Sequence, residues 1–114
     1  MAKITITGID GNGGLILDDH GKTYADHNEE VSWHVKPGSG VDSIVDIDAK
    51  GSTPSVNIWA NDPDQVGNSN IWKGTIKANG VDGKEWNYYI DWEDQYGQTQ
   101  HFDPKIIVNT TVGP

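Results

Sequence analysis

The chain has 114 residues, no cysteine and a formal net charge of −9, with eight basic side chains, all lysine, against 17 acidic ones. This length suits one domain spanning residues 1–114 with a single core, and the absence of cysteine excludes disulfides and thiol chemistry. The acidic balance predicts no nucleic-acid partner and no binding to anionic membranes, because phosphate groups would be repelled.

The N-terminus, MAKITITGID, begins as a strand and lacks the apolar core of a signal peptide. No apolar run approaches the ~20 residues needed to span a bilayer. We therefore expect a cytoplasmic protein from the sequence as written, and a secreted one if a leader was removed.

Apolar and polar residues alternate through most of the chain, a period typical of half-buried strands. In chain order, the residues predicted to face inward are Ile4 and Ile6; Val31, Trp33 and Val35; Val45 and Ile47; Val56, Ile58 and Ala60; Trp72, Gly74, Ile76 and Ala78; and Trp86, Tyr88, Ile90 and Trp92. A nearly continuous apolar run follows at 105–108, and Gly, Pro, Asn and Asp separate the runs. The pattern predicts an all-β, antiparallel, immunoglobulin-like sandwich of about 7–9 strands, with a small β-barrel as the alternative.

The stretches EVSWHV, IWKGTI, YYIDWEDQYG and FDPKIIVN, within residues 29–109, resemble small one-domain bacterial proteins with an immunoglobulin-like sandwich, mostly of unassigned function. Tyr88-Tyr89-Ile90 resembles the Tyr-x-Cys of an immunoglobulin strand F, with Ile90 in the cysteine position. Trp33 resembles the buried tryptophan of strand C. The cysteine pair is missing, so the resemblance implies the architecture alone and no catalytic residues.

The aromatic residues comprise five tryptophans, four tyrosines and one phenylalanine, and they suggest binding. Trp59 shares its parity with Asn57 and opposes Ile58, so the alternation predicts that Trp59 faces outward. Tyr89 is predicted to face outward for the same reason. The other four tryptophans are predicted to lie in the core. An exposed indole can pack on the apolar face of a sugar ring, and it can also anchor a protein interface.

The tripeptide Asn-Ile-Trp occurs at 57–59 and again at 70–72, with ten loop-like residues between the two copies. A loop is predicted over 61–70, and most of its side chains carry oxygen atoms. Such side chains could accept and donate hydrogen bonds to sugar hydroxyls, and they are also what ordinary solvated turns use. The predicted ligand-binding set is Asn57, Trp59, Asn61, Asp62, Asp64, Asn68, Asn70 and Tyr89. Calcium prefers oxygen ligands, so Asp62 and Asp64 are the candidate metal ligands.

Other chemistry finds less support. A blue-copper site needs a cysteine, and the four histidines match no zinc-ligand spacing. No nucleophile elbow, phosphate loop or dinucleotide fingerprint occurs, so the sequence predicts no enzyme. The functional prediction is a non-catalytic, lectin-like carbohydrate-binding module, with calcium as the single candidate cofactor. The alternative is a protein-interaction or structural immunoglobulin-like domain, with self-association as one form.

Overall fold

The computed structural model describes residues 2–10, 14–50 and 57–109. These residues form strands and turns, and no helix long or apolar enough to cross a membrane occurs among them. The strands are β1 (Ala2–Ile9), β2 (Leu15–Leu17), β3 (Lys22–Ala25), β4 (Glu30–Val35), β5 (Val41–Ala49), β6 (Trp59–Gln65), β7 (Ile71–Ile76), β8 (Glu85–Asp94), β9 (Thr99–Phe102) and β10 (Lys105–Val108).

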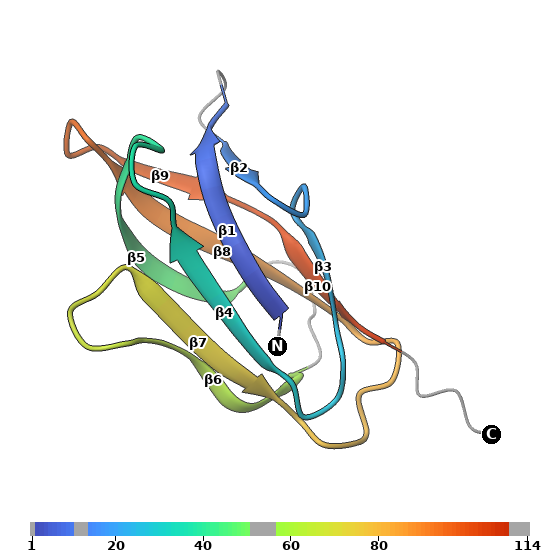
Figure 1. The fold of residues 1–114 in the computed structure, drawn as a ribbon. Helices are drawn as coiled ribbons and strands as arrows, with labels where there is room; N and C mark the ends of the chain where they lie inside the picture. The colour runs from blue at the N-terminus through green and yellow to red at the C-terminus, as the bar shows by residue number, and fades with distance from the viewer. Residues whose placement is uncertain (1, 11–13, 51–56, 110–114) are drawn as a thin grey trace.

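Two sheets pack face to face (Figure 1). The first sheet has the order β2-β1-β4-β7-β6, and the second has the order β3-β10-β8-β5, with β9 also paired to β8. The predicted all-β sandwich is confirmed. The prediction that the strands are antiparallel throughout is wrong: both sheets are mixed, because β1 pairs with β4 and β10 pairs with β3 in parallel. The chain crosses from β2 in one sheet to β3 in the other, and it then returns to place β4 beside β1 in the same direction.

The strand count exceeds the predicted 7–9, since the described residues contain ten. Two of the additional elements, β2 and β3, have only three and four residues, too few to show a clear alternation. At the other end of the chain, Asp103 and Pro104 separate β9 from β10. Proline lacks the N–H that a ladder needs, so β9 ends before Pro104 and β10 begins after it.

The alternation predicts most of the core correctly. Of the tryptophans predicted to be buried, Trp33, Trp72, Trp86 and Trp92 all are. Val45 is an exception, since it is 50% exposed while Ile44 and Ile47 point inward. The register of β5 against β8 shifts between Ile44 and Asp46, and this irregularity reverses the side that Val45 occupies.

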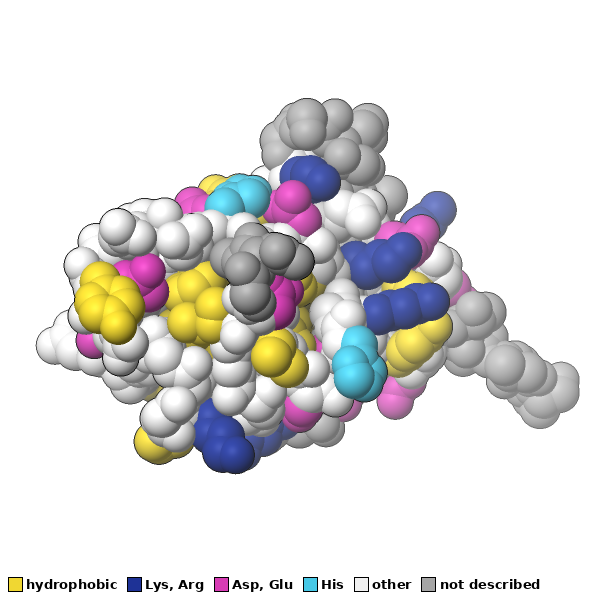
Figure 2. Space-filling model, turned by 90° about the horizontal axis from the view of Figure 1, so that it is seen from above, with side chains coloured by type: hydrophobic (Ala, Val, Ile, Leu, Met, Phe, Trp, Pro, Cys, Tyr) yellow, Lys and Arg dark blue, Asp and Glu magenta, His cyan; other side chains and the backbone are white. Residues whose placement is uncertain are grey.

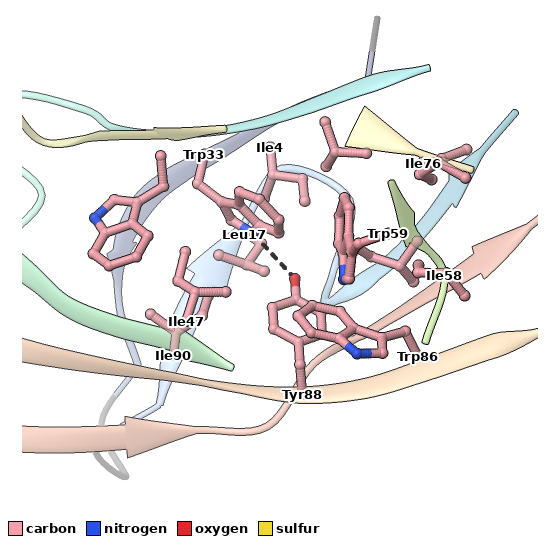
Figure 3. Close-up of a cluster of buried hydrophobic side chains, with 14 of the residues drawn as sticks. Ile4, Leu17, Trp33, Ile47, Ile58, Trp59, Ile76, Trp86, Tyr88 and Ile90 are labelled. Atoms are coloured by element: carbon pink, nitrogen blue, oxygen red, sulfur yellow. Dashed lines mark hydrogen bonds between the residues drawn. The ribbon is translucent and has the colours of Figure 1, made fainter. Parts of the chain in front are cut away.

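Four rings form the aromatic cluster between the sheets: Trp33, Trp59, Trp86 and Tyr88 (Figure 3). Tyr88 stacks on Trp86 at a centroid distance of 4.7 Å. The buried Nε1 of Trp33, on β4, donates a hydrogen bond of 3.1 Å to the Tyr88 hydroxyl on β8. This bond joins the two sheets through the core and satisfies two polar groups that burial would otherwise leave unpaired.

Replacing Tyr88 with phenylalanine tests this bond. The variant keeps the ring but leaves the Trp33 N–H buried without an acceptor, so we expect the free energy of unfolding to fall by about 1–3 kcal/mol. Urea denaturation measures the change. Tyr24→Phe is the matched control, because Tyr24 is 56% exposed and should change stability by no more than about 0.5 kcal/mol. Equal effects of the two variants would contradict the role given to the Tyr88 hydroxyl.

Candidate binding cleft between the edge strands

The prediction that Trp59 faces outward is wrong, because its side chain is only 4% exposed and belongs to the aromatic cluster. The alternation was counted through Val56 and Ile58. Val56 lies outside the described residues, and Ile58 precedes the first residue of β6. Ile58 and Trp59 are therefore both buried, and β6 shows no regular alternation after Trp59, since its next three residues are all exposed.

Gly74 on β7 makes room for Trp59. A Cβ atom at Gly74 would lie 2.8 Å from Cζ3 of Trp59 and 3.1 Å from the backbone oxygen of Asn61. The register of β6 against β7 also shifts between Trp59 and Asn61. The missing side chain at Gly74 leaves room for the indole beside β7, and the ring reaches Trp86 of the second sheet (Figure 3).

The predicted loop over 61–70 is half strand. β6 continues to Gln65, and the turn that leads into β7 covers only 66–70. Pro63 is tolerated because β6 is the edge of its sheet, where a strand residue can lack an N–H donor. Side chains expected on one loop therefore divide between an edge strand and a turn.

A cleft of about 340 Å³ opens between the edge strands β5 and β6, which belong to different sheets. Among the described residues, its lining consists of Asp46, Ile47, Asp48, Ala49, Asn57, Trp59, Asp62, Pro63 and Trp86. Three predicted site residues, Asn57, Trp59 and Asp62, thus meet at one place. The volume lies within the ~300–1,000 Å³ typical of small-ligand sites.

Polar groups around the cleft are mostly hydrogen-bond acceptors. Oδ2 of Asp46 accepts a bond of 3.0 Å from the Tyr89 hydroxyl, and Oδ1 of Asp48 accepts one of 2.7 Å from the Ala49 N–H. Within the described part of the chain, the Asp62 carboxylate has no hydrogen bond or ion pair. Several carboxylate oxygens are therefore available to a ligand.

Asn57 supplies a donor at the cleft, whereas the indole N–H of Trp59 is buried and faces the ring of Trp86. Oδ1 of Asn57 accepts a bond of 3.1 Å from the Trp59 backbone N–H, which leaves the Asn57 amide hydrogens to point elsewhere. Nε1 of Trp59 is buried and has no hydrogen-bond acceptor among the described residues. Its ring meets Trp86 edge to face at 5.0 Å and 84°. Figure 3 shows the indole nitrogen on the side directed toward Trp86.

A charged cluster adjoins the cleft on the outer face of the second sheet. The His101 imidazole contacts Asp91 through Nδ1 at 2.6 Å and Asp103 through Nε2 at 2.7 Å, and Lys50 lies 3.4 Å from Asp103. The ring of His101 stacks on Tyr89 at 5.2 Å. Tyr89, which the sequence correctly placed on this face, thus connects the charged cluster to Asp46 in the cleft.

This arrangement raises the pKa of two side chains, His101 and Tyr89. The hydrogen bond with Asp91 is the main cause of the raised pKa of His101. The charge of Asp103 also raises this pKa, whereas partial burial lowers it. Burial first, and then the hydrogen bond to Asp46 with nearby carboxylates, raises the pKa of Tyr89 to about 12. His101 is therefore stabilised as an imidazolium, and Tyr89 stays a hydrogen-bond donor at neutral pH.

The remaining predicted residues lie away from the cleft. Asn61, Asp64 and Asn68 are exposed and line no part of it, and the Asn70 amide donates a bond of 2.9 Å to the backbone oxygen of Asp42. Across the described residues, no three histidine or carboxylate side chains converge as metal ligands. The predicted calcium site at Asp62 and Asp64 therefore has no third carboxylate or histidine ligand among the described residues.

Sequence reasoning missed Asp46, Asp48, Trp86 and His101 as members of this region. Strand pairing brings these residues together, since Asp46 on β5 lies opposite Asp91 on β8, and Asp91 lies opposite His101 on β9. The alternation on β8 does place Tyr89 and Asp91 on one face, and this was the available signal. The register of β5 and β9 against β8 was the information still needed.

Comparison with known proteins adds no relative: the chain matches no family model, and no curated protein matches it. The resemblance to immunoglobulin-like bacterial proteins stays a prediction, and the argument about function rests on the cleft itself.

The contact between Gly74 and Trp59 predicts an asymmetry between two glycines on strands. Gly74→Ala forces the new methyl group against the indole and a backbone oxygen, so we expect a loss of about 1–3 kcal/mol in the free energy of unfolding. Gly8→Ala is the control, since a Cβ there would meet its nearest atom at an ordinary 3.5 Å. Chemical denaturation of both variants decides the point. A Gly74→Ala protein as stable as the Gly8→Ala protein would mean that Trp59 does not occupy this position.

The His101 contacts predict a pH-dependent contribution to stability. Because the folded-state pKa is raised, the contribution is fully present below the unfolded pKa of about 6.5 and is lost as pH rises through the folded pKa. His101→Gln should therefore be more destabilising at pH 5 than at pH 9, as measured by urea unfolding.

His34→Gln is the matched comparison for that experiment. Burial first, and then Lys3 and Lys73, lower the pKa of His34, so protonation of His34 opposes folding at low pH. The stability difference between this variant and the parent should therefore change with pH in the opposite direction. The same pH trend in both variants would refute the assignment of the His101 contacts.

Proposed function

We propose that the protein is a non-catalytic carbohydrate-binding module whose ligand occupies the cleft between β5 and β6. The observation that supports this most is the composition of the cleft: carboxylates and an amide surround a wall made by two indoles. Sugar hydroxyls both donate and accept hydrogen bonds, so they match a mixed set of acceptors and donors.

The mode of binding differs from stacking on an exposed ring. Trp59 is 4% exposed and Trp86 is 3% exposed, so they form the wall of the cleft and offer no open platform. Recognition therefore depends mainly on hydrogen bonds to Asp46, Asp48 and Asp62.

The alternative, a module that binds protein through strand pairing, has less support. The edge strand β6 contains Pro63 and two register shifts, and β5 has two register shifts as well. The other edge strands, β2, β3 and β9, are short, with three or four residues each. Proline, irregular register and short length are the features that protect sheet edges against pairing with another chain.

Exposed apolar side chains also give little support to a protein interface. The large ones belong to different elements: Ile16, Tyr24, Val45, Val66 and Tyr96. Figure 2 shows hydrophobic groups separated by polar and charged side chains on the face seen from above. Interfaces typically use a contiguous apolar patch, and singly scattered groups are normal for any surface.

A glycan array followed by calorimetry tests the proposal. We expect binding of at least one glycan class, unchanged when EDTA is present, and weakened at least about tenfold by Asp62→Ala, since one charged hydrogen bond is worth roughly 1.5–3 kcal/mol. Asp64→Ala is the control on the same strand, because Asp64 does not line the cleft. The proposal fails if no glycan binds, or if Asp62→Ala and Asp64→Ala bind equally well.

A further inference from the structure

An asparagine followed by glycine, Asn79-Gly80, lies in the connection that leads from β7 of the first sheet to β8 of the second (Figure 1). Both residues are exposed. The sequence has one other such pair, at 12–13, which lies outside the described residues. Glycine has no side chain to block the approach of its own nitrogen to the preceding side-chain amide, so this pair favours an intramolecular reaction.

The connection is held at both ends and open in the middle. The Lys77 N–H donates a bond of 2.9 Å to the Ile58 backbone oxygen, and Val81 is 2% exposed within the core. Between these anchors, the Gly80 N–H has no hydrogen bond among the described residues. A Cβ atom added at Gly80 would meet nothing within 4 Å. The Gly80 nitrogen is therefore free to lose its proton to water and to turn toward the Asn79 side chain.

Two comparable pairs are protected by hydrogen bonds to the backbone. Asp82-Gly83 also ends in glycine, but its glycine N–H donates a bond of 3.0 Å to the Val108 oxygen. Asn68-Ser69 lies in the turn before β7, and its serine N–H donates a bond of 3.1 Å to the Val66 oxygen. A nitrogen that is held in a hydrogen bond keeps its proton and its position. The fold thus distinguishes Asn79 from other sites with a small following residue.

Water has access to the side chain of Asn79. The connection borders a hollow of about 540 Å³, whose lining among the described residues is His27, Ala78, Asn79, Gly80, Asp82 and Lys84. The cleft between β5 and β6 is a different place, since neither Asn79 nor Gly80 lines it. Chemistry at Asn79 is therefore independent of the glycan binding proposed above.

We infer that Asn79 is a site of spontaneous deamidation. The Gly80 nitrogen attacks Cγ of Asn79, and the new C–N bond closes a five-membered succinimide ring. The Asn79 amide group leaves as ammonia with the proton of the Gly80 N–H. Water then opens the ring: cleavage at Cγ gives aspartate, and cleavage at the main-chain carbonyl gives isoaspartate. Both products add a negative charge, and isoaspartate also lengthens the backbone by one atom just before the buried Val81.

Peptide mapping of the whole protein, aged in a mildly alkaline buffer, tests this inference. Cleavage after lysine releases residues 78–84 as one peptide and places 12–13 in another, 4–22. We expect aspartate and isoaspartate to form at position 79. The matched variant is Asp82→Asn, which makes a second asparagine-glycine pair in the same peptide while the Gly83 N–H keeps its bond to Val108. Position 79 should then convert at least about tenfold faster than position 82.

Repeating the measurement on the same variant unfolded in urea separates structure from local sequence. Urea removes the bond of the Gly83 N–H, so the two rates should converge. An aged parent protein with no conversion at position 79 overturns the inference. Equal rates at the two positions in the folded variant overturn it too, and so does a difference that persists in urea, because the fold would then not be its cause.

Discussion

The hydrogen bond between Trp33 and Tyr88 is the contact on which the rest of the structure depends. It joins β4 of one sheet to β8 of the other at 3.1 Å, inside a core from which water is excluded. Pairing removes the free-energy cost of leaving a buried N–H and a buried hydroxyl unsatisfied, so the bond favours this arrangement of the two sheets. Trp59 and Trp86 complete the aromatic cluster around it and become the wall of the cleft.

A short chain connection links the two sheets along one side of the sandwich, and the cleft lies along the other side, where no such connection covers it among the described residues. On one side the chain passes directly from β2 to β3, so a connecting turn links the two sheet edges. On the other side β5 and β6 are both edges, and the cleft opens between them. Acidic side chains, Pro63 and irregular register on these strands oppose strand addition, while the same carboxylates remain available to a small ligand.

The sequence predicted the sheets and most of the core, because strict alternation survives wherever pairing is regular. Trp33, Tyr88 and Ile90 were placed inside correctly. The prediction failed at Val45 and Trp59, where the register shifts or the strand begins late, since the parity of a strand cannot be read across such a point.

The site was predictable only in part, for a related reason. Asn57, Asp62 and Trp59 are close in sequence and line the same cleft, although Trp59 was expected to be exposed. Asp46 and Trp86 reach the same cleft from distant strands, through pairings that one sequence does not reveal.

The central claim, that a glycan binds beside the aromatic cluster, is tested most directly by NMR. The five indole N–H signals can be followed while a glycan that binds on the array is added. We predict that the Trp59 signal shifts with saturation while that of Trp33, already bonded to Tyr88, stays in place. An unchanged Trp59 signal at saturating ligand would contradict the account.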